Sequence, residues 1–188
     1  MHALLAKIPI GMRQTAIYAL SLAAMKGVSF LMLPVFTHYL SREEYGRLDI
    51  LQTLADLLSI VFAMGLADTL FRFAGAAEND AERRRAASTI AGIGLTSTFL
   101  FLILGQVAAP VITELLPGAA DLLHVRLILA SLSLTTAILI PLAWLRMADR
   151  ASWYAVGTLG RVGFQALLAA ALLWFGFGIT GVLAAGLV

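Results

Sequence analysis

The sequence predicts an all-α protein, a polytopic bundle of transmembrane helices. The first observation is composition, since 61% of the 188 residues are hydrophobic and 13% are charged, against about 45 to 50% and about 25% in ordinary soluble domains. The second is that apolar runs of about 20 residues, the length that crosses a bilayer, recur along the chain. The third is that Pro, Gly and clustered charges separate these runs, as expected for the loops of a helix bundle.

One transmembrane domain over residues 1–188 is expected to hold five full spans and a partial one. The spans lie at about 15–36, 48–70, 86–109, 125–145 and 153–175, and the partial sixth, 179–188, ends with the chain. For the first span the rival interpretation is a cleavable signal peptide, whose apolar core would have about 7 to 15 residues. This run is longer and contains Lys26, so we expect a retained helix.

The connection between the first two spans carries the clearest local signal. Ser41 stands three residues before Glu44, which is the capping-box pattern: the hydroxyl accepts from a first-turn amide and the carboxylate reaches back to the cap amide. We therefore expect a helix to start at Ser41, after a tight turn that makes it antiparallel to the first. Tyr39 and Tyr45 suit the lipid headgroup level, so the turn marks the membrane surface.

The third span is bounded by similar local signals. Asn79 and Glu82 form a second capping pair ahead of it. Pro110 is expected to end it, because proline lacks the N–H that continues a helix, and the following connection is broken at Pro117 and Gly118. Small residues recur at steps of four in this span and predict a helix-packing face, namely Ser88, Gly92 and Thr96.

The distribution of basic residues predicts that the N-terminus is cytoplasmic. Eight of them would lie in inner segments and three in outer ones, and cytoplasmic segments carry the Lys/Arg excess. The inner set is Lys7, Arg13, Arg72, Arg83, Arg84, Arg85, Arg146 and Arg150, and the outer set is Arg42, Arg47 and Arg126.

Polar residues inside the first two spans predict either a cavity or a structural ion pair. Lys26 would lie about 16 Å and Asp56 about 12 Å below the surface marked by the turn, so their depths match. Asp49, Gln52, Asp56 and Ser59 share one helix face. Because such a stripe should not face lipid, we expect it to line an aqueous cavity with Lys26 beside it. The alternative is a Lys26–Asp56 pair, with the other polar groups at the water interface.

The fifth span offers a second candidate cation. Gly157, Arg161 and Gln165 are spaced four residues apart and share a face. Arg161 either extends back to the inner headgroups or projects into the cavity as an anion-binding group. Its planar guanidinium would suit a phosphate, because it can bond two oxygens at once.

Several classes of function lack their sequence signals here. There is no Cys, no catalytic motif and no long extramembrane loop, and the three His lie in separate segments, so we expect no enzyme, no metal site and no cofactor. The formal net charge of +2 is too small to indicate a nucleic-acid partner.

The run FLMLPVFTHYLSREEYGRLDILQTL, followed by GLADTLFRFAG and ENDAERRRAAST, resembles the start of a Wzx-type lipid-linked oligosaccharide (O-antigen) flippase of the multidrug/oligosaccharidyl-lipid/polysaccharide exporter superfamily. The resemblance covers residues 15–97, and later spans match in hydropathy. It implies translocation of undecaprenyl-diphosphate-linked glycans across the bacterial inner membrane, for polysaccharide and lipopolysaccharide biosynthesis, by alternating access between two lobes. Lys26 and Arg161 would then be cavity cations, and Asp56 would tune or couple them.

The resemblance also implies partners. These are the lipid-linked oligosaccharide, the bilayer and a coupling cation, either a proton or sodium. Members have 12 or more spans, so the expectation is an N-terminal lobe of a truncated chain that needs a C-terminal lobe or a homo-oligomer. The alternatives are a multidrug or cation antiporter of the same superfamily and a non-transporting membrane scaffold.

Overall fold

The computed structural model describes residues 10–62, 72, 79–117 and 121–188, and within these ranges it contains helices and no strand. The helices are α2 (Ile10–Tyr39), α3 (Arg42–Phe62), α5 (Asp80–Leu115), α6 (Leu122–Met147), α7 (Ala151–Trp174) and α8 (Gly178–Ala185). Four stretches of the described residues are long and apolar enough to cross a membrane: Gln14–Tyr39, Arg84–Leu115, Leu122–Met147 and Ala151–Trp174. The predicted fold class, an all-α polytopic bundle, is confirmed.

The expected spans agree closely with the helices. Those at 15–36, 86–109 and 125–145 lie inside α2, α5 and α6, and the span at 153–175 nearly coincides with α7. The span at 48–70 begins in α3, and its residues 63–70 lie outside the described part of the chain. The described part of α3 is not one of the four apolar stretches, because its 21 residues include six that are charged. The expected partial sixth span, 179–188, overlaps α8, which begins one residue earlier.

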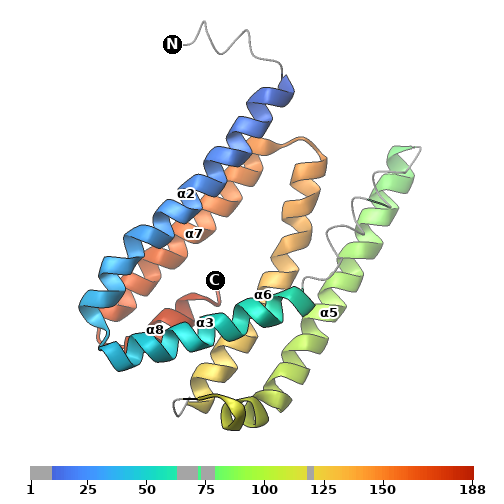
Figure 1. Cartoon of the computed structure of the whole chain (residues 1–188). Coiled ribbons are helices and arrows are strands. Elements are labelled where there is room, and N and C mark those ends of the chain that lie inside the picture. The colour runs from blue at the N-terminus through green and yellow to red at the C-terminus, as the bar shows by residue number, and fades with distance from the viewer. Residues whose placement is uncertain (1–9, 63–71, 73–78, 118–120) are drawn as a thin grey trace, which may run out of the picture.

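The helices pack mainly as two pairs. In Figure 1, α2 runs alongside α7, while α5 packs on α6, and α3 crosses α6 between the two pairs. Helix α8 turns back against α7 and also contacts α6 and α3. The C-terminal residues therefore lie in the middle of the molecule, close to the region where α3 crosses.

The expected antiparallel packing of the first two helices is wrong. Helices α2 and α3 make little contact with one another, and Figure 1 shows α3 leaving the turn at a wide angle to α2. The physical reason is that each helix has a better partner. Helix α2 packs along α7, whereas Leu48 and Leu51 of α3 are buried in a core shared with Val125 of α6 and Leu183 of α8.

The capping box at the start of α3 is confirmed. The backbone N–H of Ser41 donates to Glu44 Oε2 at 2.8 Å, and the N–H of Glu44 donates to Ser41 Oγ at 3.2 Å. Asn79 likewise caps α5, since its side-chain Oδ1 accepts from the N–H of Glu82 at 2.8 Å. Both helix starts are therefore fixed by local side-chain chemistry rather than by tertiary packing.

The prediction that Pro110 ends the third span is wrong. Helix α5 continues through Pro110 to Leu115, so it is 36 residues long. It ends two residues before Pro117, and the intervening Leu116 is extended with φ −78° and ψ 134°, the conformation that a following proline favours. Membrane helices tolerate proline where their neighbours compensate for it; Pro110 itself is exposed, and the adjacent Ala109 is fully buried in the main core.

The predicted packing face of α5 is also misplaced. Ser88, Gly92 and Thr96 are exposed, and a Cβ added at Gly92 would meet nothing within 4 Å. The contact with α6 is instead made about two residues away, where a Cβ at Gly94 would clash with Ile140. Gly94 therefore permits a close approach of α6 to α5 at Ile140. Residue size alone did not identify which of the two small-residue faces of α5 makes this contact.

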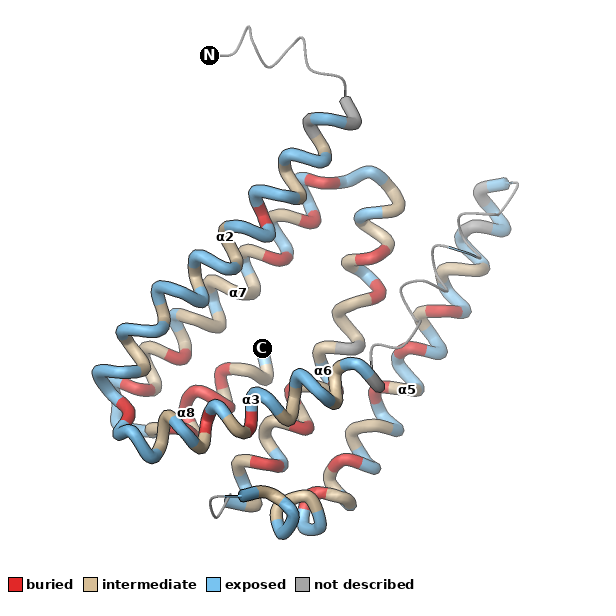
Figure 2. Tube along the Cα trace, viewed as in Figure 1, coloured by how far each residue is buried: buried red, intermediate tan, exposed pale blue. Residues whose placement is uncertain are grey.

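Burial is concentrated on the inner faces of the last helices. Figure 2 shows α2 and α3 largely exposed, with buried positions along α6, α7 and α8. Large apolar side chains are exposed in the spans, including Phe30 at 74% and Val107 at 72%. A helix that is apolar on all sides is typical of a segment that lies in lipid, and these exposed apolar faces agree with the length and composition of the spans.

Candidate binding cavity

A cavity of about 570 Å³ lies between α2, α3, α6, α7 and α8. One wall is formed by α2 and is mostly apolar, with Val28, Met32 and Phe36 beside a single hydroxyl, that of Ser29. The facing walls carry the other polar side chains, which are Tyr45, Asp49, Gln52, Ser131, Thr135, Arg161 and Gln165. The cavity is therefore amphipathic, with most of its polar side chains supplied by α3, α6 and α7.

Helical periodicity brings the polar groups together. Arg161 and Gln165 are one turn apart on α7, and Ser131 and Thr135 are one turn apart on α6, so each pair lies on one face. Because α3 crosses α6 instead of following α2, the first turns of α3, rather than its whole polar stripe, reach the cavity.

Arg161 is the cationic residue of the cavity lining. It is partly buried, and its Nη2 donates to Thr135 Oγ1 at 3.1 Å. Its Nε is buried and has no hydrogen-bond partner. A guanidinium has five N–H donors, and the hydrogen bond recorded for this one uses a single N–H of Nη2.

The structure brings together three of the six predicted site residues. Gln52, Arg161 and Gln165 all line the cavity, whereas Lys26, Asp56 and Ser59 are not among its lining residues. Lys26 and Asp56 are exposed. The Oγ of Ser59 donates to the backbone carbonyl of Asp56 at 2.7 Å.

Lys26 and Asp56 do not form an ion pair. Their similar depths below the membrane surface had suggested such a pair as the alternative to a cavity. The salt bridge that the structure records within the described ranges joins Arg47 to Glu43, one turn apart on α3. The depth argument assumed that α3 runs back along α2. Since α3 turns away from α2, equal distance from the turn does not bring the two side chains together.

Thr135 and Ser131 are lining residues that the sequence reasoning missed. Both lie in the span at 125–145 and are spaced four residues apart, the same signal that identified Arg161 and Gln165. The apolar wall of α2 gave no signal, because Met32 and Phe36 are indistinguishable by residue type from the lipid-facing residues of the same helix.

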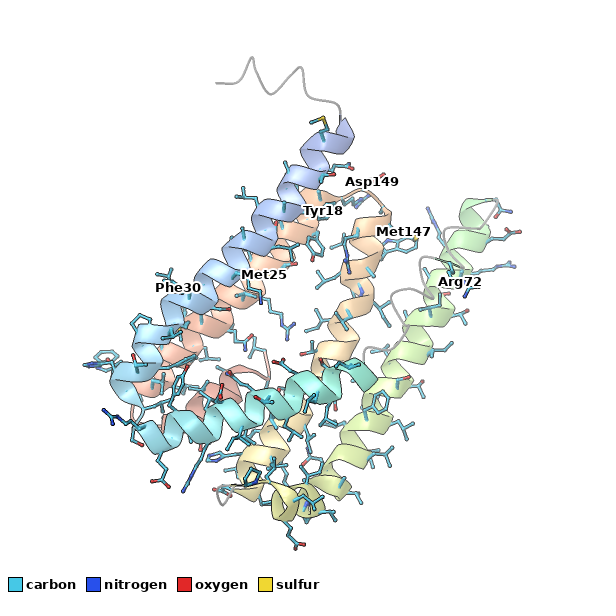
Figure 3. All side chains as sticks on the ribbon, viewed as in Figure 1. Tyr18, Met25, Phe30, Arg72, Met147 and Asp149 are labelled. Atoms are coloured by element: carbon cyan, nitrogen blue, oxygen red, sulfur yellow. The ribbon has the colours of Figure 1, made fainter. Side chains whose placement is uncertain are left out.

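The opposite end of the α2–α7 pair combines direct helix contacts with a smaller pocket of about 320 Å³, which Gln14, Ile17 and Asp149 help to line. Gln14 Nε2 donates to the backbone carbonyl of Asp149 at 2.9 Å, and the rings of Tyr18 and Tyr154 meet edge to face with centroids 5.2 Å apart. The Arg146 guanidinium lies 5.5 Å from the centroid of the Tyr154 ring. Figure 3 shows Tyr18 and Asp149 together at this end, whereas the cavity lies toward the turn that joins α2 to α3.

Comparison with known proteins gives one family match. A family model described as "Polysaccharide biosynthesis protein" matches residues 12–188, which include every residue that lines the cavity. Neither the curated proteins nor the solved structures yielded a significant match. The match extends over nearly the whole sequence, and the chain belongs to the polysaccharide biosynthesis protein family.

Proposed function

We propose that the protein is a flippase that carries an undecaprenyl-diphosphate-linked oligosaccharide across the bacterial inner membrane, with its N-terminus in the cytoplasm. The observation that carries this proposal is Arg161, a partly buried cation that lines an amphipathic cavity. Family membership supports a role in polysaccharide biosynthesis. The described helices would form one lobe of an alternating-access transporter, and a proton or sodium ion would drive the cycle.

The two walls of the cavity match the two parts of such a substrate. The guanidinium of Arg161 would bond diphosphate oxygens, and Gln52 and Gln165 would exchange hydrogen bonds with sugar hydroxyls. The apolar face of α2, with Met32 and Phe36, would contact the first isoprene units. A volume of about 570 Å³ is within the range of about 300 to 1,000 Å³ found for ligand pockets. It suits the diphosphate and its nearest sugar, while the rest of the lipid stays in the bilayer.

An antiporter that exports cationic drugs fits the cavity less well. A guanidinium in a low-dielectric cavity repels cations, and the acidic lining residue, Asp49, is itself exposed. An anionic substrate gains from Arg161 and a cationic one does not. Expression with a panel of cationic drugs tests this alternative, since the flippase proposal predicts no change in drug tolerance.

The direct test is export in a bacterial strain that lacks its own O-antigen flippase. Arg161→Gln should reduce surface glycan at least about tenfold, since hydrogen bonds to charged groups contribute about 1.5 to 3 kcal/mol. Arg161→Lys should recover part of it, because an ammonium keeps the charge and loses the two-pronged geometry. Surface glycan is measured by immunoblot, normalised to the amount of protein in the membrane.

A matched control is Arg126→Gln, which removes an exposed Arg of α6 that does not line the cavity. This variant should export like the wild type. If Arg161→Gln exports as well as Arg126→Gln at equal membrane levels, Arg161 has no part in transport and the proposal fails.

A further inference from the structure

The contact between Arg161 and Thr135 links α7 to α6 at the wall of the cavity. Arg161 Nη2 donates to Thr135 Oγ1 at 3.1 Å. The Thr135 hydroxyl in turn donates to the backbone carbonyl of Ser131, one turn earlier on α6, at 2.9 Å. Because a hydroxyl has one donor and two acceptor sites, using its hydrogen within α6 leaves its lone pairs for the guanidinium.

This arrangement fixes the direction of a side chain that would otherwise be mobile. A free Arg side chain has about 2 kcal/mol of rotamer entropy, and an Arg inside a span tends to extend toward the headgroups. The β-branched Thr135 is restricted at χ1, and its back-bond to Ser131 holds it further. It therefore provides a fixed acceptor that keeps the guanidinium at the cavity wall.

We propose that Thr135 is a positioning residue, which holds the Arg161 guanidinium in the orientation that receives the anionic group of the substrate. This inference rests on the flippase proposal and adds to it a residue that acts through Arg161. The acceptor oxygen is the essential atom. A serine at position 135 therefore preserves the function, whereas an isosteric valine removes it.

The test measures binding of farnesyl diphosphate, a short isoprenyl diphosphate, to the purified 188-residue protein in detergent. Thr135→Val should weaken binding about fivefold, the factor that corresponds to one ordinary hydrogen bond, and Thr135→Ser should recover it to within about twofold. The matched control is Thr98→Val, because Thr98 is buried and makes the same back-bond, to the carbonyl of Gly94 at 2.9 Å, but lies outside the cavity. That control should bind like the wild type.

A double-mutant cycle separates positioning from a general effect on folding. In the Arg161→Gln background, Thr135→Val should have no further effect on binding, because the group that Thr135 holds is gone. Equal losses from Thr135→Val in both backgrounds would overturn the positioning role, as would wild-type affinity in Thr135→Val itself.

Thermal unfolding of the empty protein distinguishes failure of this inference from failure of the flippase proposal. Thr135→Val should lower the unfolding temperature when Arg161 is present and leave it unchanged in Arg161→Gln. If this coupling is found but the wild type does not bind farnesyl diphosphate, the contact holds and the proposed substrate is wrong. If the coupling is absent, Thr135 does not position Arg161, whatever the protein transports.

Discussion

The two ends of the α2–α7 pair differ in what fills the space beside them. At the Gln14 end, a side-chain hydrogen bond to Asp149 and the edge-to-face contact of Tyr18 with Tyr154 join the two helices beside a pocket of about 320 Å³. Toward the α2–α3 turn, the same two helices border a cavity of about 570 Å³ that Arg161 lines. We call the first the packed end, because aromatic rings join the helices there, and the second the hollow end, because it borders the larger of these two spaces.

Under the flippase proposal, this difference means that one end of the helix pair stabilises the fold and the other binds the substrate. Tyr154 is buried and contacts both Tyr18 and Arg146, so the packed end holds α2 against α7. Arg161 and Gln165 are two to three turns further along α7, where a packed aromatic would occupy the binding space. Substitutions at the packed end should therefore change unfolding, and substitutions at the hollow end should change export.

The largest effect is expected from filling the hollow end. Ala166 lines the cavity beside Gln165, and Ala166→Phe would place a ring in the space that the polar part of the substrate needs. Export should fall at least about tenfold with the protein still inserted, because overpacking an open cavity costs less than overpacking a core. Surface glycan and membrane protein levels are measured together in the complemented strain.

The matched control for that experiment is Ala23→Phe, since Ala23 is exposed on α2 and is not among the cavity-lining residues. It adds the same ring to a lipid-facing position and should export normally. Equal export by the two variants would show that substrate does not occupy the cavity.

The next largest effect is expected at the packed end. Tyr154→Ala removes a buried ring together with its contacts to Tyr18 and Arg146, and we expect a loss of about 3 kcal/mol in the free energy of unfolding. Unfolding is followed in detergent by circular dichroism. The neighbouring Trp153, 65% exposed, provides the control, because Trp153→Ala should change stability far less. A Tyr154→Ala protein as stable as Trp153→Ala would remove the contrast between the two ends.

The smallest effect concerns the turn at the hollow end. Hydrogen bonds from the backbone and then the side chain of Ser41 lower the pKa of Glu44. Since the folded pKa lies below the unfolded one, the cap stabilises the protein above the unfolded pKa, about 4.3, and this contribution is lost as the pH falls through the folded pKa. The site is exposed, so we expect less than about 1 kcal/mol.

Unfolding temperatures measured between about pH 6 and pH 3 test this effect. Glu44→Gln should remove the part of the pH dependence that belongs to the cap. Glu43→Gln should retain it, because Glu43 pairs with Arg47 and takes no part in the Ser41 hydrogen bonds. An identical pH dependence in both variants would mean that the cap does not stabilise the turn.

Local features of this protein were predictable from its sequence. The caps at Ser41 and Asn79 depend on residues three apart, and the apolar spans depend on length and composition alone. The placement of Arg161 beside Gln165 was predictable for the same reason, because a helix puts residues four apart on one face. Each of these signals operates within a single turn or a single span.

Features that depend on helix-to-helix geometry were not predictable. Matching depths did not bring Lys26 to Asp56, because the angle at which α3 leaves the turn is set by the burial of Leu48 and Leu51 against α6 and α8. Pro110 did not end α5, because whether a proline stops a helix depends on what packs around it. Gly92 and Gly94 are both small, and the position of Ile140 on α6 determines which of them is in contact.

The sequence by itself determined that this chain is an all-α membrane protein, where its capped helices begin, and that a cationic residue lies inside a span. The tertiary structure alone decided that Arg161 meets Thr135 from another helix and that α3 contributes Asp49 and Gln52, but not Asp56, to the cavity. The reason is that periodicity and capping act over three or four residues, whereas a cavity is the space left between helices whose crossing angles depend on all their contacts.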